Sequence, residues 1–180
     1  ILFDWNGDGL QDLICGEFLT GQSRMKVYLN TGTKKKPKFT GEWFYATDTE
    51  GNVMSNYEWC CIGIHPQIVD LDQDGYPDII SGQYYPGLIS WWRGSEKGFL
   101  PRQYIEQEYY VEGKRYKSTE PYSPMSHNYW NYTTARFADF NGDGLLDLFV
   151  GGNGGLRVAL NVGTKEHPKL GVRQIGRAHV

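Results

Sequence analysis

Residues Asp70 to Asp78 read DLDQDGYPD, and the chain contains two close copies of this stretch. One is DWNGDGLQD, from Asp4 to Asp12, and the other is DFNGDGLLD, from Asp139 to Asp147. All three fit the pattern D-x-[DN]-x-D-G-x-x-D and lead into an apolar run that ends in glycine. Oxygen-bearing side chains at alternate positions, with a glycine for the sharp turn, are what a hard cation requires. Three copies therefore predict a calcium-binding repeat protein.

The repeat also predicts the architecture. The copies begin 66 and 69 residues apart, which leaves room for one small supersecondary unit per repeat. Short runs of β-branched and aromatic residues flank each copy, so we expect each copy to be the tip of a β-hairpin. A third such run follows at 26–29, 88–92 and 157–160, and a fourth near 43–47 and 103–106. Four antiparallel strands per repeat predict an all-β chain of β-propeller blades. A β-sandwich with acidic turns is the alternative, but sandwiches do not repeat on this period.

Helical calcium loops do not fit this sequence. An EF-hand needs a bidentate glutamate at loop position 12. That position holds Cys15, Ser81 and Val150 here, and the residues that follow favour strands.

The three loops resemble the FG-GAP repeat family, also described as VCBS or integrin-alpha-like repeats. The turns NTGTKKKPKF (residues 30–39) and NVGTKEHPKL (residues 161–170) look like those of bacterial members. The resemblance implies a propeller of about seven blades with calcium bound between the first two strands of a blade. The "GAP" part of the family signature is absent after each loop, which separates the chain from animal integrins.

The resemblance implies four side-chain ligands and one backbone carbonyl in each loop. They are Asp4, Asn6, Asp8, Asp12 and the Leu10 carbonyl; Asp70, Asp72, Asp74, Asp78 and the Tyr76 carbonyl; and Asp139, Asn141, Asp143, Asp147 and the Leu145 carbonyl. The loops hold three, four and three of the 21 acidic residues, and like charges this close repel without a cation. We expect about three Ca²⁺ ions per chain in a structural role. The second loop, with four carboxylates, is expected to bind most tightly. The alternative is that the loops are solvated acidic turns.

The units span about residues 1–47, 66–106 and 134–173, which makes about 2.7 blades of a partial propeller. A propeller closes with about four to eight blades, so we expect the remaining blades of a parent propeller to be partners of this segment. Residues 174–180 do not resemble the other fourth strands, and we interpret them as a frayed or non-native tail.

A ligand is expected on the face opposite the metals. In a blade, the acidic loops and the turn at 30–39 share one face, and the links at about 48–65 and 107–133 lie on the other. Loops on a rigid scaffold often carry binding sites. The candidates are Tyr84, Tyr85, His127, Tyr129 and Trp130, because flat aromatic faces suit sugar rings. Packing of these rings against neighbouring blades is the alternative.

These features predict a non-enzymatic, calcium-stabilised module that mediates binding or adhesion to a glycan or an extracellular protein. We expect it outside the cytosol: extracellular, periplasmic or on a cell surface. With a net charge of −3 and scattered basic residues, no nucleic-acid patch is expected. No apolar run approaches the roughly 20 residues of a membrane span. No G-x-S-x-G or H-E-x-x-H motif occurs, so no catalytic residue is named. The alternatives are the propeller portion of a polysaccharide-degrading enzyme, such as a calcium-dependent lyase, and a structural spacer.

Overall fold

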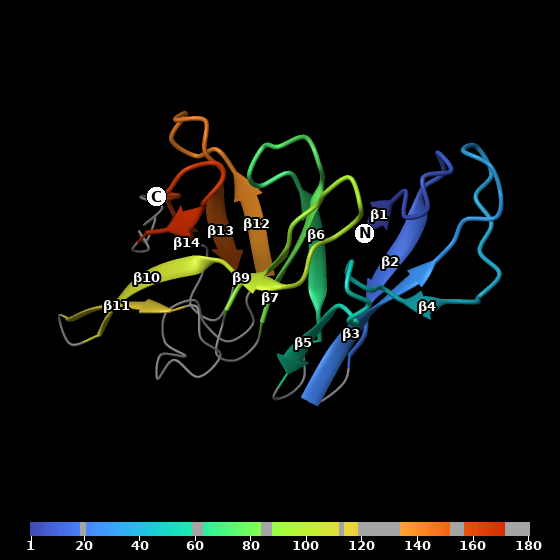
Figure 1. The fold of residues 1–180 in the computed structure, drawn as a ribbon, viewed down its shortest axis with the longest axis horizontal. Helices are drawn as coiled ribbons and strands as arrows, with labels where there is room; N and C mark the ends of the chain where they lie inside the picture. The colour runs from blue at the N-terminus through green and yellow to red at the C-terminus, as the bar shows by residue number, and fades with distance from the viewer. Residues whose placement is uncertain are drawn as a thin grey trace, which may run out of the picture.

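The computed structural model of the protein describes residues 1–18, 21–58, 63–83, 88–111, 114–118, 134–151 and 157–171 (Figure 1). Throughout these ranges the regular elements are strands, and none of them is a helix. The prediction of an all-β chain is confirmed. The same ranges accordingly contain no helix that is long and apolar enough to cross a membrane.

Three antiparallel sheets follow one another along the chain, one per repeat. The first is ordered β1 (Leu2–Phe3), β2 (Asp12–Gly16), β3 (Gly21–Tyr28) and β4 (Phe44–Tyr45). The second is ordered β6 (His65–Val69), β7 (Asp78–Gly82), β8 (Ser90–Trp92) and β9 (Gln103–Tyr104). The third contains β12 (Thr134–Ala138), β13 (Asp147–Gly151) and β14 (Arg157–Ala159). This up-and-down order is that of propeller blades, and each acidic loop joins the first two strands of its sheet.

The two long links contribute strands that the sequence pattern did not predict. In the first link, β5 (Ser55–Glu58) pairs antiparallel with the first half of β3. In the second, β10 (Glu106–Val111) and β11 (Lys114–Ser118) form a hairpin. Strand β10 also pairs in parallel with β15 (Lys169–Leu170), which an antiparallel bridge between Asn161 and Leu170 joins to the end of the third sheet. Strand β15 lies within the turn at 161–170 and is equivalent to Lys38 and Phe39 of the first unit, which precede the fourth strand β4.

The core lies between neighbouring sheets, so each sheet is stabilised by the next one along the chain. Ile14 and Val27 of the first sheet pack in one cluster with Ile79 and Trp92 of the second. Their sequence neighbours Ile80 and Trp91 point to the other side, into a cluster that includes Leu148 and Val150 of the third sheet. The middle sheet is thus covered on both faces, and every residue of β7 is buried.

The three acidic loops lie along one edge of this row of sheets, at the top of Figure 1. The turn at 30–39 reaches the same edge, because a Cβ placed on Gly9 would lie 3.9 Å from Nζ of Lys34. Gln73 Nε2 donates a 2.6 Å hydrogen bond to the carbonyl of Gly144, which links the second and third loops. The three loops together form an acidic edge, on the face where the strand order predicts them.

Candidate metal-binding loops

The first aspartate of each loop organises the loop backbone. In the first loop, the amide of Gly9 donates to Oδ2 of Asp4 at 2.8 Å and the amide of Asp8 to Oδ1 at 3.1 Å. Asp70 and Asp139 accept the corresponding glycine amides, those of Gly75 and Gly144, each at 3.0 Å. These three glycines have φ values of +82°, +93° and +86°, which side-chain-bearing residues rarely adopt. The glycine in the pattern is therefore required by the curl of the backbone around the first carboxylate.

The last aspartate of each loop fastens the hairpin to the rest of its sheet. Asp12, Asp78 and Asp147 are fully buried, and each accepts two backbone N–H groups. One N–H group belongs to the second residue of the loop and donates at 2.8–2.9 Å; this residue is Trp5, Leu71 or Phe140. The other belongs to the turn after the third strand and donates at 2.6–2.8 Å; this residue is Asn30, Gly94 or Asn161. We call this pair of bonds the aspartate latch. Sequence reasoning named these residues only as ligands. The sequence does contain a signal for this second role. Each of these aspartates is the first residue of a buried strand, where a carboxylate needs hydrogen-bond donors from the backbone.

The turns at 30–39 and 161–170 have matching internal hydrogen bonds. Oδ1 of Asn30 accepts the amides of Gly32 and Lys38, and Oδ1 of Asn161 accepts those of Gly163 and Lys169, all at 3.0 Å. In the second unit, Gly94 takes the place of these asparagines. A Cβ there would lie 2.3 Å from the carbonyl oxygen of Pro77, so no side chain fits. The shared turn sequence is thus a structural motif, and the second unit replaces it.

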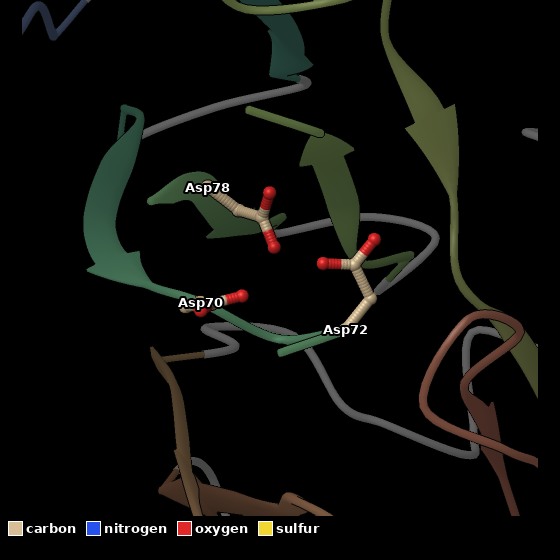
Figure 2. A group of neighbouring side chains, drawn as sticks. All are labelled: Asp70, Asp72 and Asp78. Carbon is tan, nitrogen blue, oxygen red and sulfur yellow. The ribbon is translucent and has the colours of Figure 1, made fainter. Parts of the chain in front are cut away.

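In the second loop, three carboxylates converge. Oxygens of Asp70, Asp72 and Asp78 all lie within 4.8 Å of one another, and Figure 2 shows the three side chains around one space. Two oxygens that bind the same Ca²⁺ at about 2.3–2.6 Å are at most about 5 Å apart. Oδ1 of Asp72 is buried and has no hydrogen-bond partner among the described residues. A buried carboxylate oxygen without a donor is costly, so the residues present fit a divalent cation.

Burial also disfavours the charged form of these carboxylates. It raises the pKa of Asp78 to about 6, although the amides of Gly94 and Leu71 oppose the shift. It raises the pKa of Asp72 as well, against the attraction of Arg93 and with the repulsion of Asp74. A cation between the carboxylates would reverse both shifts.

Arg93 contacts two aspartates of the second loop. Its Nη2 donates to Oδ2 of Asp74 at 3.0 Å, and its Nε forms an ion pair with Oδ2 of Asp72. The Nε contact lacks hydrogen-bond geometry, so it is electrostatic only. Asp74 lies outside the convergent group, and its Oδ1 accepts the amide of Tyr76 at 2.9 Å. The structure therefore brings together three of the four predicted side-chain ligands of this loop.

The first and third loops are arranged differently, because each has an asparagine where the second has Asp72. Asn6 donates from Nδ2 to Oδ2 of Asp8 at 3.0 Å, and Asn141 does so to Asp143 at 2.8 Å. Across the described residues, the second loop is where three acidic side chains meet closely enough to share an ion. The backbone amides of Leu10 and Leu145 donate to Asp8 and Asp143, both at 2.8 Å. Coordination by the carbonyls of Leu10, Tyr76 and Leu145 stays a prediction.

The residues predicted to bind a ligand are Tyr84, Tyr85, His127, Tyr129 and Trp130, and all five lie outside the described ranges. Their role stays a prediction.

Comparison with known proteins found a family match for part of the chain. Residues 70–150, which span the second and third loops, match the model of the FG-GAP-like repeat family. The chain therefore carries an FG-GAP-like repeat, and the resemblance predicted from the three loops is confirmed in this segment. Searches of curated proteins and of solved structures found no match to the chain.

Proposed function

We propose that this chain is a calcium-binding module of a β-propeller in which each ion fixes the tip of one hairpin. The observation that carries the proposal is the second loop. There, both carboxylate oxygens of Asp72 are buried without a hydrogen-bond donor, and one of them lies within 4.8 Å of oxygens of Asp70 and Asp78. The FG-GAP-like repeat at residues 70–150 supports the same assignment for the equivalent positions of the third loop.

The ion's role in this proposal is structural. Each candidate site lies on a hairpin tip, and its first and last aspartates already hold the backbone by hydrogen bonds. A cation would neutralise the crowded carboxylates and so stabilise the folded hairpin. Extended calcium loops of this kind suit the millimolar calcium found outside cells, which supports an extracellular, periplasmic or cell-surface location.

Calcium titration calorimetry on the exhaustively chelated chain tests the proposal. We expect about three sites per chain and a higher melting temperature at saturating calcium. A folded chain that neither takes up calcium nor changes its melting temperature would contradict the proposal. The variant Asp139→Ala should remove one site, whereas Asp48→Ala, which changes an acid outside the loops, should leave all of them.

We further propose that the module binds a glycan or a protein partner. Among the described residues, a hollow of about 620 Å³ beside the turn at 30–39 offers a place for a sugar ring. Trp43 and Phe44 line it and are 42% and 41% exposed, and Glu42, Thr31 and Thr40 add oxygens for hydroxyl groups. This hollow lies next to the acidic edge, whereas the sequence predicts a ligand on the opposite face. Quenching of tryptophan fluorescence by soluble glycans tests it: Trp43→Ala should abolish the response, and Phe140→Ala, on the third unit, should not.

A further inference from the structure

The second unit differs from the other two at a pair of positions whose charges compensate each other. The aspartate latch sets the alignment, because Asn30, Gly94 and Asn161 all donate to the last aspartate of their loop. The residue before each donor is therefore equivalent: Leu29, Arg93 and Leu160. At the third loop position, the residues are Asn6, Asp72 and Asn141. The second unit thus gains one negative and one positive charge together.

The structure shows that these two exchanged residues contact each other. The side chain of Asp72 is completely buried and that of Arg93 is 34% exposed, and Arg93 Nε forms an ion pair with Asp72 Oδ2. The same guanidinium reaches Oδ2 of Asp74 at 3.0 Å. A buried carboxylate is tolerated only when a positive charge or several donors compensate it. Arg93 supplies that compensation for one oxygen of Asp72, while the other oxygen, Oδ1, stays without a hydrogen-bond partner.

We propose that Arg93 is a built-in cation of the second loop. It holds Asp72 and Asp74 in place when calcium is absent, and it competes with calcium when the ion binds. This inference rests on the proposed function, in which the loops bind calcium. With Arg93 counted, the second loop has the same net charge as the other two, so its fourth carboxylate gives calcium no additional attraction. The ion must also bind beside a fixed positive charge. The second loop is therefore the last of the three to load, which reverses the expectation from carboxylate number alone.

A calcium titration of the full chain, monitored by nuclear magnetic resonance, distinguishes calcium binding at the three loops. The amides of Gly9, Gly75 and Gly144 each donate to the first aspartate of one loop and so report on the ordering of that loop. In the unchanged chain, we expect the Gly9 and Gly144 signals to move at lower calcium concentrations than the Gly75 signal. In Arg93→Leu, which installs the residue of the other units, the Gly75 midpoint should fall about tenfold or more, because a unit charge beside a divalent ion is lost.

The melting temperature in the presence of a chelator is a second readout, because it tests the contact between Arg93 and Asp72 when no metal is bound. Arg93→Leu leaves a buried carboxylate unpaired, so its melting temperature in EDTA should fall more than in saturating calcium. Lys97→Leu is the matched control, because it removes one positive charge from the same turn without touching Asp72 or Asp74. Arg93→Gln keeps most of the side-chain volume and serves if the leucine variant unfolds in EDTA.

Each outcome bears on a different claim. In one outcome, the Gly9 and Gly144 signals respond to calcium but Arg93→Leu does not lower the calcium midpoint of the Gly75 signal. That result would overturn the role of Arg93 and leave the proposed function intact. A folded chain in which none of the three amides responds to calcium would overturn both.

The same pair of residues can also be introduced into the third unit as a further test. Asn141→Asp alone should lower the Gly144 midpoint, because it adds a fourth carboxylate. Adding Leu160→Arg should raise the midpoint again and make the loop less dependent on calcium for stability. A double variant that binds as tightly as Asn141→Asp alone would count against the inference.

Discussion

Replacing Asp147 with alanine and measuring stability in a chelator separates the aspartate latch from metal binding, because the latch bonds join protein groups only. The change removes acceptors from two backbone amides, those of Phe140 at 2.9 Å and Asn161 at 2.7 Å. The Asn161 bond is buried, so its amide bears the full penalty of an unsatisfied donor, about 1–3 kcal/mol. The Phe140 bond is only partly buried, and water can replace part of it. We expect Asp147→Ala to lower the free energy of unfolding by about 2–4 kcal/mol.

Urea unfolding in the presence of EDTA measures this loss. With a denaturant dependence of about 2 kcal/mol per molar, the midpoint should fall by about 1–2 M. Asp147→Asn keeps one acceptor oxygen and should lose roughly half as much. Asp143→Ala in the same loop is the control: its carboxylate is exposed and bonds Leu145 and Asn141, so its loss should stay under about 1 kcal/mol. Equal losses for Asp147→Ala and Asp143→Ala in EDTA, or a loss seen only with calcium, would refute the latch.

Three further predictions concern pH, the backbone conformation of Gln73 and the asparagine turn. The raised pKa values of Asp72 and Asp78, the latter about 6, mean that the folded metal-free chain binds more protons than the unfolded chain. The stability of the chelated chain should therefore fall as the pH rises from about 4.5 to 6, and saturating calcium should remove the decline; a rise in EDTA would contradict this. Gln73 has a φ of +56° at the position where the other loops have Gly7 and Gly142. Because a side chain disfavours this conformation, urea unfolding should show Gln73→Ala to be about 1 kcal/mol less stable than Gln73→Gly. Equal unfolding midpoints for the two variants would argue against backbone strain at Gln73. Asn30→Ala leaves the amides of Gly32 and Lys38 without their acceptor and should cost about 1–3 kcal/mol, whereas a loss no larger than that of Thr40→Ala would speak against the turn's role.

The first three strands of each unit could be predicted from the sequence because apolar runs and turn residues alternate there. The pairing of β5 with β3 and that of β10 with β15 could not, because these partners lie far apart in the chain. Nothing local in Ser55–Glu58 indicates that β3 has a free edge beside it.

The carboxylates of the candidate site could be predicted from the sequence, whereas their partners from distant parts of the chain could not. The D-x-[DN]-x-D-G spacing places carboxylates on one short loop, and the structure shows their convergence in the second copy. Arg93 lies 19 residues beyond Asp74, and the latch donor Asn30 lies 18 residues beyond Asp12, so no local pattern connects them. The one signal for Arg93 was the absence of the N-x-G-T turn from the second unit.

The aspartate latch has a consequence for how such chains lengthen and shorten. In all three units, both latch bonds stay within one sheet, from the loop to the turn after its own third strand. A gene segment that encodes one unit therefore carries everything needed to fix its own hairpin tip. Duplication or deletion of such a segment leaves the latches of the neighbouring units intact. The apolar surfaces between sheets and the contacts between units, such as the hydrogen bond from Gln73 to Gly144, must adapt. Designed arrays with altered unit number can exploit the same independence by joining whole units within the links.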